Sequence, residues 1–266
     1  MNAPRPTPIE LADLACTAEE LARAAGKVAL GYFGARIEVE TKADDTPVTV
    51  ADREAESLLR AEIRRRYPDH GIVGEEHGEV LPGAPVRWIL DPIDGTKSFV
   101  QGVPLWGVLI GIEVEGEPVA GVVHLPALGE TVTAAKGLGC RWNGRPCTVS
   151  PETRLERSLV LTSDESAFHG HPGEAGWRAL AAAARMTRSW GDCYGHVLVA
   201  TGRAQVMVDP VLAAWDAAPL LTILTEAGGC FTDVSGEPTI HGGSGVSSNP
   251  ALHPQVLKLL AGDPYP

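Results

Sequence analysis

The N-terminal quarter of the chain carries apolar residues at helical spacing. From Leu11 onwards they recur every three or four positions, at Leu11, Leu14, Ala15, Ala18, Leu21, Ala22, Ala25, Val28, Ala29 and Tyr32. This period predicts an amphipathic helix, and Gly34 is a candidate for the residue that caps its end. A second helix is expected over residues 50–66, because apolar side chains fall on one face and Pro68 lies just beyond its end.

After residue 70 the pattern changes to that of β-strands. Apolar and β-branched runs occupy residues 71–76, 86–90, 106–114, 118–125 and 130–135. The sequence EGEP (115–118) between the third and fourth runs predicts a hairpin. We therefore expect two helices followed by a mostly antiparallel sheet in the first half of the chain.

The second half alternates between strands and helices. Strands are expected at residues 158–163, 205–210, 230–234 and 245–248, and helices at 173–186, 193–202, 213–229 and 250–262. Such alternation predicts helices that cover a sheet. The expected fold class is α/β (α+β), with an N-terminal α+β lobe over residues 1–150 and a C-terminal α/β lobe over residues 151–266.

Composition limits the possible partners. The chain has 266 residues, 44% of them hydrophobic, and a formal charge of −12, with no basic run longer than Arg64–Arg66. These values argue against nucleic acid or an anionic membrane as the main partner. No apolar run approaches the roughly 20 residues that span a bilayer, and the N-terminus lacks the apolar region of a signal peptide. Five scattered cysteines are typical of reduced thiols, so a soluble cytoplasmic protein is expected.

Acidic residues follow the ends of several apolar elements. Asp91 and Asp94 follow the run WIL (88–90), and the candidate acids elsewhere in the chain are Asp52, Glu75 and Asp216. Carboxylates that converge in a buried pocket repel one another unless they are protonated or bridged by a cation. Mg²⁺ prefers carboxylate and phosphate oxygens as ligands. Together these acids predict a magnesium site that takes a phosphate ester.

Each of these acids also has a purely structural explanation. Asp52 could be the third residue of a capping box, and Asp216 could stabilise a helix N-terminus. Asp91 and Asp94 could be turn formers, and the acids of GIVGEE (71–76) could lie in a solvated loop. The joint arrangement favours the metal site.

Thr96 supplies a further chemical group. With Gly95 it is expected to open a short helical turn, whose N–H groups can bind a phosphate oxygen. Its hydroxyl can orient a water molecule, and Asp52 can accept the proton of that hydroxyl. Bound cations would lower the pKa of the water, which predicts metal-assisted hydrolysis. They would also reverse the local field, so that an acidic protein can take an anionic substrate.

Four segments together resemble the inositol monophosphatase superfamily of Mg²⁺-dependent, lithium-sensitive phosphatases. They are TKADDTPVTVAD (41–52), GEE (74–76), WILDPIDGTKSF (88–99) and AAWDAAPLLTILTEAGG (213–229), and the similarity covers nearly the whole chain in the family's order. The resemblance implies a layered αβαβα sandwich, of the type shared with fructose-1,6-bisphosphatase, and a homodimer.

The resemblance also implies ligands for two to three Mg²⁺ ions and inhibition by Li⁺. One ion would be held by Glu75, Asp91 and the backbone carbonyl of Ile93, and a second by Asp91, Asp94 and Asp216. A third, weaker site would involve Glu75 and mostly water.

Catalytic and substrate-binding roles are implied in the same way. Asp52, Glu75 and Thr96 would be catalytic, with Asp52 and Thr96 as the pair that activates water. The implied substrate contacts are Asp94, Gly95, Thr96, Asp192 and Asp216.

Two further segments resemble the histidinol-phosphate phosphatase branch. They are GTKSFVQGVPLWGVLIG (95–111) and SWGDCYGHVLVATGRAQVMVD (189–209). The resemblance implies hydrolysis of L-histidinol phosphate to L-histidinol and phosphate, a step of histidine biosynthesis. Asp192 would then face the ammonium or imidazolium of that substrate. Alternatively, it is the N-cap of a helix that begins at Cys193.

Other functions stay open at this point. The same chemistry would suit an inositol-1-monophosphatase or a phosphatase of another small phosphate ester. A nucleotide or sugar bisphosphatase is disfavoured, because the chain shows no evident basic cluster for a second phosphate. A non-catalytic metal-binding regulator is the most remote alternative. Cys193 and His196 have zinc-ligand spacing, but no second pair is evident and a structural role is expected. The roles of Lys97, His169 and His171 stay undecided.

Overall fold

The computed structural model describes residues 6–35, 39–41 and 47–262. Its helices are α1 (Pro8–Leu30), α2 (Val50–Arg66), α3 (Thr96–Val100), α4 (Glu174–Ala183), α5 (Asp192–Ala200), α6 (Ala214–Glu226) and α7 (His253–Leu260). Its strands are β1 (Val39–Thr41), β2 (Pro47–Thr49), β3 (Gly71–Gly74), β4 (Gly78–Val80), β5 (Val86–Asp94), β6 (Gly107–Val114), β7 (Glu117–Leu125), β8 (Glu130–Ala135), β9 (Gly139–Trp142), β10 (Arg145–Pro146), β11 (Leu159–Leu161), β12 (Met186–Arg188), β13 (Val206–Asp209), β14 (Cys230–Thr232) and β15 (Gly245–Ser248).

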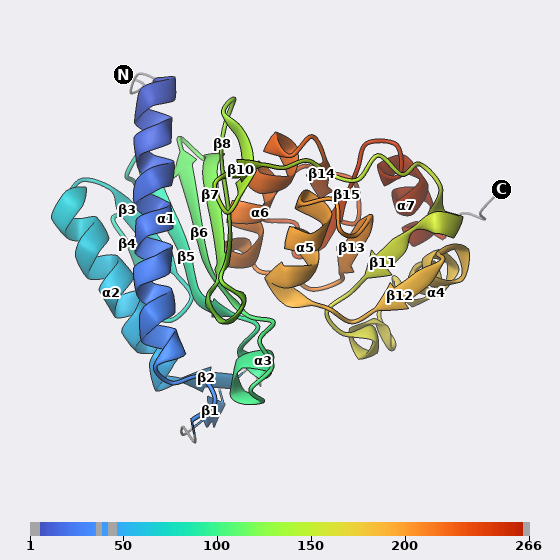
Figure 1. Cartoon of the computed structure of the whole chain (residues 1–266), viewed down its shortest axis with the longest axis horizontal. Helices are drawn as coiled ribbons and strands as arrows, with labels where there is room; N and C mark the ends of the chain where they lie inside the picture. Colours follow the sequence, from blue (N-terminus) through green and yellow to red (C-terminus); the bar gives the residue numbers. More distant parts are fainter. Residues whose placement is uncertain (1–5, 36–38, 42–46, 263–266) are drawn as a thin grey trace.

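These elements form layers of helices and sheets (Figure 1). Helices α1 and α2 cover one face of an eight-stranded sheet, with strand order β10-β9-β8-β7-β6-β5-β3-β4. Helices α5 and α6 separate this sheet from a five-stranded sheet, with order β12-β11-β13-β15-β14, and α4 and α7 lie on its outer side. The layers confirm the predicted αβαβα sandwich.

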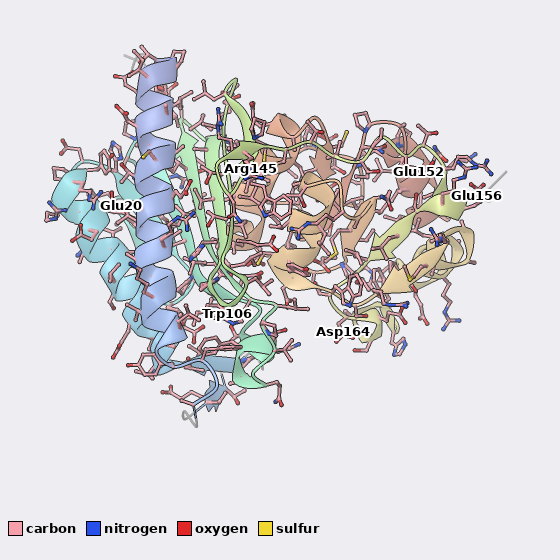
Figure 2. All side chains as sticks on the ribbon, in the orientation of Figure 1. Glu20, Trp106, Arg145, Glu152, Glu156 and Asp164 are labelled. Atoms are coloured by element: carbon pink, nitrogen blue, oxygen red, sulfur yellow. The ribbon has the colours of Figure 1, made fainter. Side chains whose placement is uncertain are left out.

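The first two helices form where the apolar period predicts them. Helix α1 begins with a capping box between Thr7 and Glu10, and α2 spans the predicted residues 50–66. Arginines fill the last turn of α2, where the helix dipole favours cations. One of them, Arg66, bonds Glu20 of α1 at 2.8 Å, and Figure 2 shows Glu20 between the two helices.

Two predicted helix ends are wrong. Helix α1 ends at Leu30 and is capped by Gly31, whereas Gly34 takes a left-handed conformation (φ 77°) in the turns that follow. Helix α4 ends at Ala183 rather than near residue 186. The N–H of Arg185 donates to the carbonyls of Leu155 and Ser158, which draws the following residues into strand β12.

The sequence pattern also missed short strands. In β1 all three residues are exposed, and β4 buries little, so neither shows an apolar alternation. The hairpin of β6 and β7 and the strand β8 lie where the pattern predicts them. Trp106 is fully buried in the core, and Figure 2 shows it near the end of the large sheet.

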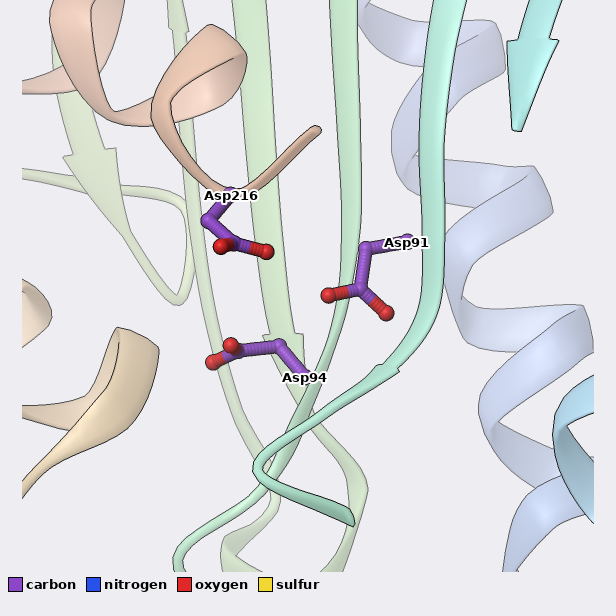
Figure 3. Close-up of side chains that lie close together, drawn as sticks. All are labelled: Asp91, Asp94 and Asp216. Carbon is purple, nitrogen blue, oxygen red and sulfur yellow. The ribbon is translucent and has the colours of Figure 1, made fainter. Parts of the chain in front are cut away.

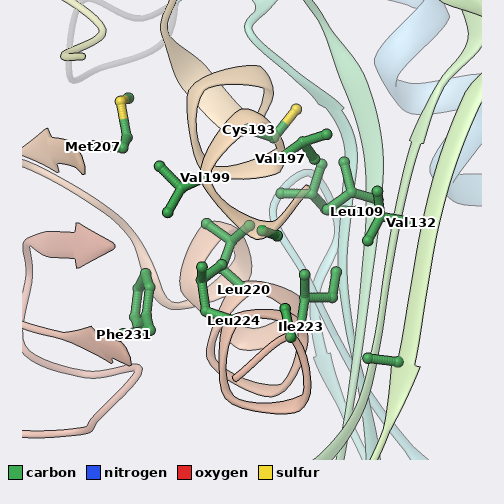
Figure 4. Packing of buried hydrophobic residues seen from close by; sticks show 14 of the residues in the cluster. Leu109, Val132, Cys193, Val197, Val199, Met207, Leu220, Ile223, Leu224 and Phe231 are labelled. Carbon is green, nitrogen blue, oxygen red and sulfur yellow. The ribbon is translucent and has the colours of Figure 1, made fainter. Parts of the chain in front are cut away.

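Helix α6 fills the space between the two sheets. Its residues Leu220, Ile223 and Leu224 are buried in one cluster with Leu109 of the large sheet and Phe231 of the small one (Figure 4). The helix comes from the second half of the chain, yet it packs on strands from the first half. The predicted division into lobes at residue 150 stays a prediction.

Two glycines allow α6 to approach the large sheet closely. Gly111 and Gly121 lie opposite each other on β6 and β7. A Cβ atom on Gly111 would lie 2.6 Å from the Cβ of Ala218, and one on Gly121 would lie 2.8 Å from the Cα of Pro219. Side chains at these positions would push α6 away from the sheet.

Within the described part of the chain, no helix combines the length and apolar character that a membrane crossing requires. The longest described helix, α1, has 23 residues but buries only one face.

Gly121→Ala tests the contact between α6 and the sheet. The new methyl group would meet backbone atoms of Pro219, which cannot rotate away, so the free energy of unfolding should fall by roughly 1–3 kcal/mol or more. Urea unfolding of the purified protein measures this loss. Gly83→Ala is the matched control, because a Cβ there meets nothing within 4 Å. Equal stability of the two variants would contradict the close contact.

Candidate active site

A bulge in strand β5 brings two acids to the same side of the sheet. Side chains three residues apart point to opposite faces of a regular strand. Between Asp91 and Asp94, however, the pairing with β6 shifts, since Asp91 pairs with Leu109 and Asp94 with Gly107. The extra residue turns both carboxylates to one side. The sequence pattern had ended this strand at residue 90, which is wrong.

Asp216 completes a cluster of three carboxylates. It lies in the first turn of α6, and Figure 3 shows its side chain pointing toward Asp91 and Asp94. One oxygen from each of the three carboxylates lies within 4.8 Å of the others. One Asp216 oxygen accepts from the N–H of Ala213 at 2.8 Å, so the predicted helix-terminal role and the place in the cluster coexist.

The carboxylates of this cluster resist ionisation in the absence of a cation. Burial raises the pKa of Asp91 well above its usual value, and the charges of Glu75 and Asp94 raise it further. Burial and the charge of Asp216 raise the pKa of Asp94 to about 7. Burial likewise raises the pKa of Asp216 to about 7. A hard divalent cation would relieve this repulsion, so the donor set fits the magnesium that the sequence implies.

Glu75 lies in the loop that follows β3, and strand β3 pairs with β5 in parallel. Its N–H donates to the carbonyl of Leu90 at 3.2 Å, next to the cluster. The fully buried carboxylate of Glu56 holds this loop, because it accepts from the N–H of Glu76 at 2.8 Å and pairs with Arg60 at 2.6 Å. Glu75 is therefore fixed beside Asp91 rather than free in a solvated loop.

Asp52 is buried next to Thr96 and does not itself line the cavity at the site. One Asp52 oxygen accepts from the Thr49 N–H at 2.8 Å, which belongs to the capping box of α2, and from the Thr49 hydroxyl at 2.6 Å. The other oxygen lies 3.5 Å from the Thr96 hydroxyl, which donates more closely, at 2.9 Å, to the carbonyl of Ile93. Burial raises the pKa of Asp52, and the nearby charge of Glu75 adds to this effect. The structural and the catalytic interpretations of Asp52 are therefore compatible.

Gly95 begins helix α3, as the sequence predicted for the turn at Thr96. Its φ of 83° is left-handed, and a Cβ there would lie 2.9 Å from the carbonyl oxygen of Leu105. The surrounding cavity has a volume of about 290 Å³. It is lined by Pro47, Glu75, Asp91, Ile93, Asp94, Gly95, Thr96, Lys97, Asp192, Val211, Leu212, Ala213, Trp215 and Asp216.

Asp192 lines this cavity beside Gly95, and we refer to residues 191–192 as its rim. It is not an N-cap, because α5 begins at Asp192 itself and Gly191 is the cap residue. Burial raises the pKa of Asp192 to about 8, with contributions from Asp94 and Asp209, while the Lys97 charge acts in the opposite direction. A cationic group of a ligand would stabilise the ionised carboxylate at this rim.

Other contacts at the site left no signal in the sequence. The backbone N–H of Cys193 donates to Asp94 at 2.6 Å, although the two residues are 99 positions apart. Val211, Leu212 and Trp215 give the cavity an apolar wall. A backbone donor and a loop wall carry no motif of their own, so only the tertiary structure reveals them.

The remaining histidine candidates have structural surroundings. His196 is fully buried, with Nδ1 at 2.7 Å from the Ser247 hydroxyl and Nε2 at 3.2 Å from Asp209. Its expected structural role is confirmed. His169 is exposed at the end of a short 3-10 helix and does not line the cavity.

Comparison with known proteins identifies the family. The model of the inositol monophosphatase family matches residues 10–263. The chain belongs to the inositol monophosphatase family. The predictions of this family and of a phosphatase enzyme are therefore confirmed.

Relatives within the inositol monophosphatase family agree with the predicted branch. A histidinol-phosphatase of Chlorobaculum parvum is 48% identical, over 91% of this chain and 94% of its own. A histidinol-phosphatase of Streptomyces coelicolor is 38% identical, over 91% of this chain and 95% of its own. The crystal structure of the extragenic suppressor protein suhB from Bartonella henselae superposes with a TM-score of 0.85 and 29% identity, over 93% of this chain and 98% of that one.

The raised pKa values predict how Mg²⁺ stabilises the protein at different pH. Without a cation, the folded state keeps protons on Asp94 and Asp216 up to about pH 7, whereas unfolded aspartates lose theirs near pH 4. These groups therefore destabilise the fold as pH rises from about 4 to about 7. An ion bound here would prefer the ionised carboxylates, so we expect Mg²⁺ to raise the melting temperature by roughly 5–10 °C at pH 8 and by much less at pH 5.

Differential scanning fluorimetry measures this difference, with NaCl of equal ionic strength as the control. The Mg²⁺ effect should also shrink in Asp94→Asn. An equal rise at both pH values, or an equal rise in NaCl, would show that the cluster does not bind the ion.

Proposed function

We propose that this protein is a magnesium-dependent phosphomonoesterase that hydrolyses L-histidinol phosphate to L-histidinol and phosphate. The observation that carries the proposal is the cavity itself. The cavity is lined by the carboxylates suited to divalent cations and by a further carboxylate, Asp192. Such a cavity suits a small ester that carries both a phosphate and a cationic group. The names of the two similar histidinol-phosphatases support the same substrate.

The chain's own residues would hold the ions. Glu75, Asp91 and the carbonyl of Ile93 would form one ligand group, and Asp91, Asp94 and Asp216 a second. All five residues line the cavity. When bound, the ions offset the negative charge of the phosphate and lower the pKa of the attacking water.

Thr96 and Asp52 would handle the proton of that water. The Thr96 hydroxyl lies between the Ile93 carbonyl and Asp52, at 2.9 and 3.5 Å. A small rotation would turn its hydrogen toward Asp52 and leave its oxygen to accept from a water molecule. The raised pKa of Asp52 makes this carboxylate a better proton acceptor than an exposed aspartate.

The two ends of the substrate would be held by different parts of the chain. The N–H groups of Gly95 and Thr96, at the start of α3, would bind phosphate oxygens. Asp192 would pair with the ammonium or imidazolium. The cavity of about 290 Å³ is small, which favours a monophosphate of a small molecule.

The proposal also covers the metal ions, the inhibitor, the cellular location and the oligomeric state. It includes two to three Mg²⁺ ions in each site, inhibition by Li⁺, a cytoplasmic location and a homodimer, all implied by the resemblance of the sequence. Inositol 1-phosphate is the second candidate substrate, because the family carries that name. It has no cation to pair with Asp192, so we rank it below L-histidinol phosphate.

A substrate panel tests the proposal. Phosphate release should be far faster from L-histidinol phosphate than from inositol 1-phosphate in the presence of Mg²⁺, and EDTA should abolish both activities. A reversed preference would overturn the substrate and leave the metal-dependent chemistry. Full activity in EDTA would overturn the metal.

Asp94→Asn should abolish turnover, with a loss of at least about a hundredfold in kcat/KM, because one carboxylate of the shared ion site is removed. The change is isosteric, so the fold should persist in circular dichroism. Asp69→Asn is the matched control, since Asp69 is exposed and lies outside the cavity. Near-normal turnover of Asp94→Asn would refute its role as a ligand.

A further inference from the structure

The backbone at the rim of the cavity takes an unusual conformation. Asp192 has a φ of 53°, in the left-handed region that non-glycine residues rarely adopt. No side chain caps the N-terminus of α5 at this point. Other contacts must therefore hold Asp192 in place.

Ser163 provides the first of these contacts. Its hydroxyl accepts from the N–H of Asp192 at 2.7 Å. It also packs tightly beneath the preceding residue, since a Cβ on Gly191 would lie 2.6 Å from the Ser163 Cβ. The rim at residues 191–192 therefore rests on Ser163, which follows strand β11.

Three buried polar residues, Asp209, His196 and Ser247, form a hydrogen-bonded series that holds Ser163 in place. The N–H of Ser163 donates to one oxygen of Asp209 at 2.9 Å, and the other Asp209 oxygen lies 3.2 Å from Nε2 of His196. Nδ1 of His196 lies 2.7 Å from the hydroxyl of Ser247. Nε2 of His196 can donate to the Asp209 carboxylate while Nδ1 accepts from the Ser247 hydroxyl.

This series has no direct access to the cavity. Asp209 is 2% exposed, His196 and Ser247 are fully buried, and none of the three lines the cavity. His196 lies one helical turn after Asp192 on α5, so the series fixes this helix at both Asp192 and His196. Removing a partner would leave a buried polar group unpaired, so the series has a definite geometry.

We propose that His196 and Asp209 are positioning residues that hold the backbone at Asp192 and thereby direct its carboxylate toward the cationic end of the substrate. They act through Ser163 and do not touch the substrate. The inference rests on the proposed function and extends it, because it assigns selectivity for a phosphate ester that bears a cation to residues behind the cavity wall. Loss of the series should weaken recognition of the cation and spare the phosphate chemistry.

His196→Leu tests this inference, because it keeps much of the volume and removes both hydrogen bonds. The KM for L-histidinol phosphate should rise about tenfold, whereas the KM for inositol 1-phosphate and both kcat values should change less than about twofold. His196→Gln should restore much of the selectivity, since its amide can donate to Asp209. An equal loss with both substrates would indicate a merely structural role and overturn the inference.

Double variants and a smaller change give independent tests. Asp192→Asn should lose the same selectivity, and adding His196→Leu to it should cause no further rise in KM, because both changes act through one carboxylate. If His196→Leu does not fold, Ser163→Ala tests the inference instead, since it removes only the hydroxyl that accepts from the N–H of Asp192. A substrate-independent effect of Ser163→Ala would contradict the proposal.

The wild-type protein separates this inference from the proposed function. A wild type without preference for L-histidinol phosphate would overturn the proposed function and the inference with it. A wild type with that preference, whose selectivity survives in His196→Leu and Ser163→Ala, would overturn the inference alone.

Discussion

The close approach of α6 to the eight-stranded sheet is the contact on which the site depends. Gly111 and Gly121 face each other across β6 and β7, and the absence of their side chains lets the backbone near Ala218 lie against the sheet. Asp216 is two residues away in the same helix, so the depth of this packing decides how close its carboxylate comes to those of β5. Packing in the middle of the molecule thereby sets the geometry of the carboxylate cluster, as precise core packing does for other functional sites.

The same packing forces a conflict of charges that a cation would resolve. Asp91, Asp94 and Asp216 lie close together where little water reaches them. Their raised pKa values reflect the free energy that ionising these carboxylates requires. A fold selected only for stability would place apolar residues there. The cluster is therefore a local loss of stability that binding a divalent ion would recover, which connects folding, pH and catalysis in one group of residues.

The sequence predicts those features that depend on local pattern. The helical period of α1 and α2, the hairpin of β6 and β7 and the set of acids are visible without a structure, and the family resemblance groups the acids into one site. The bulge of β5 is harder, because Pro92 and the spacing of Asp91 and Asp94 suggest a turn as readily as a strand. Strand β12 was missed because backbone bonds to Leu155 and Ser158, not local preference, end the preceding helix.

Contacts between distant segments lie beyond such patterns, and one of them ties the segment at Asp192 to the carboxylate cluster. The N–H of Cys193 donates to Asp94 at 2.6 Å, directly after the rim residue Asp192. The position of the rim is thus tied to a carboxylate of the cluster by a backbone bond, which any residue except proline can form. The Asp192 side chain also lies beside Gly95, so the same two segments meet at two adjacent points.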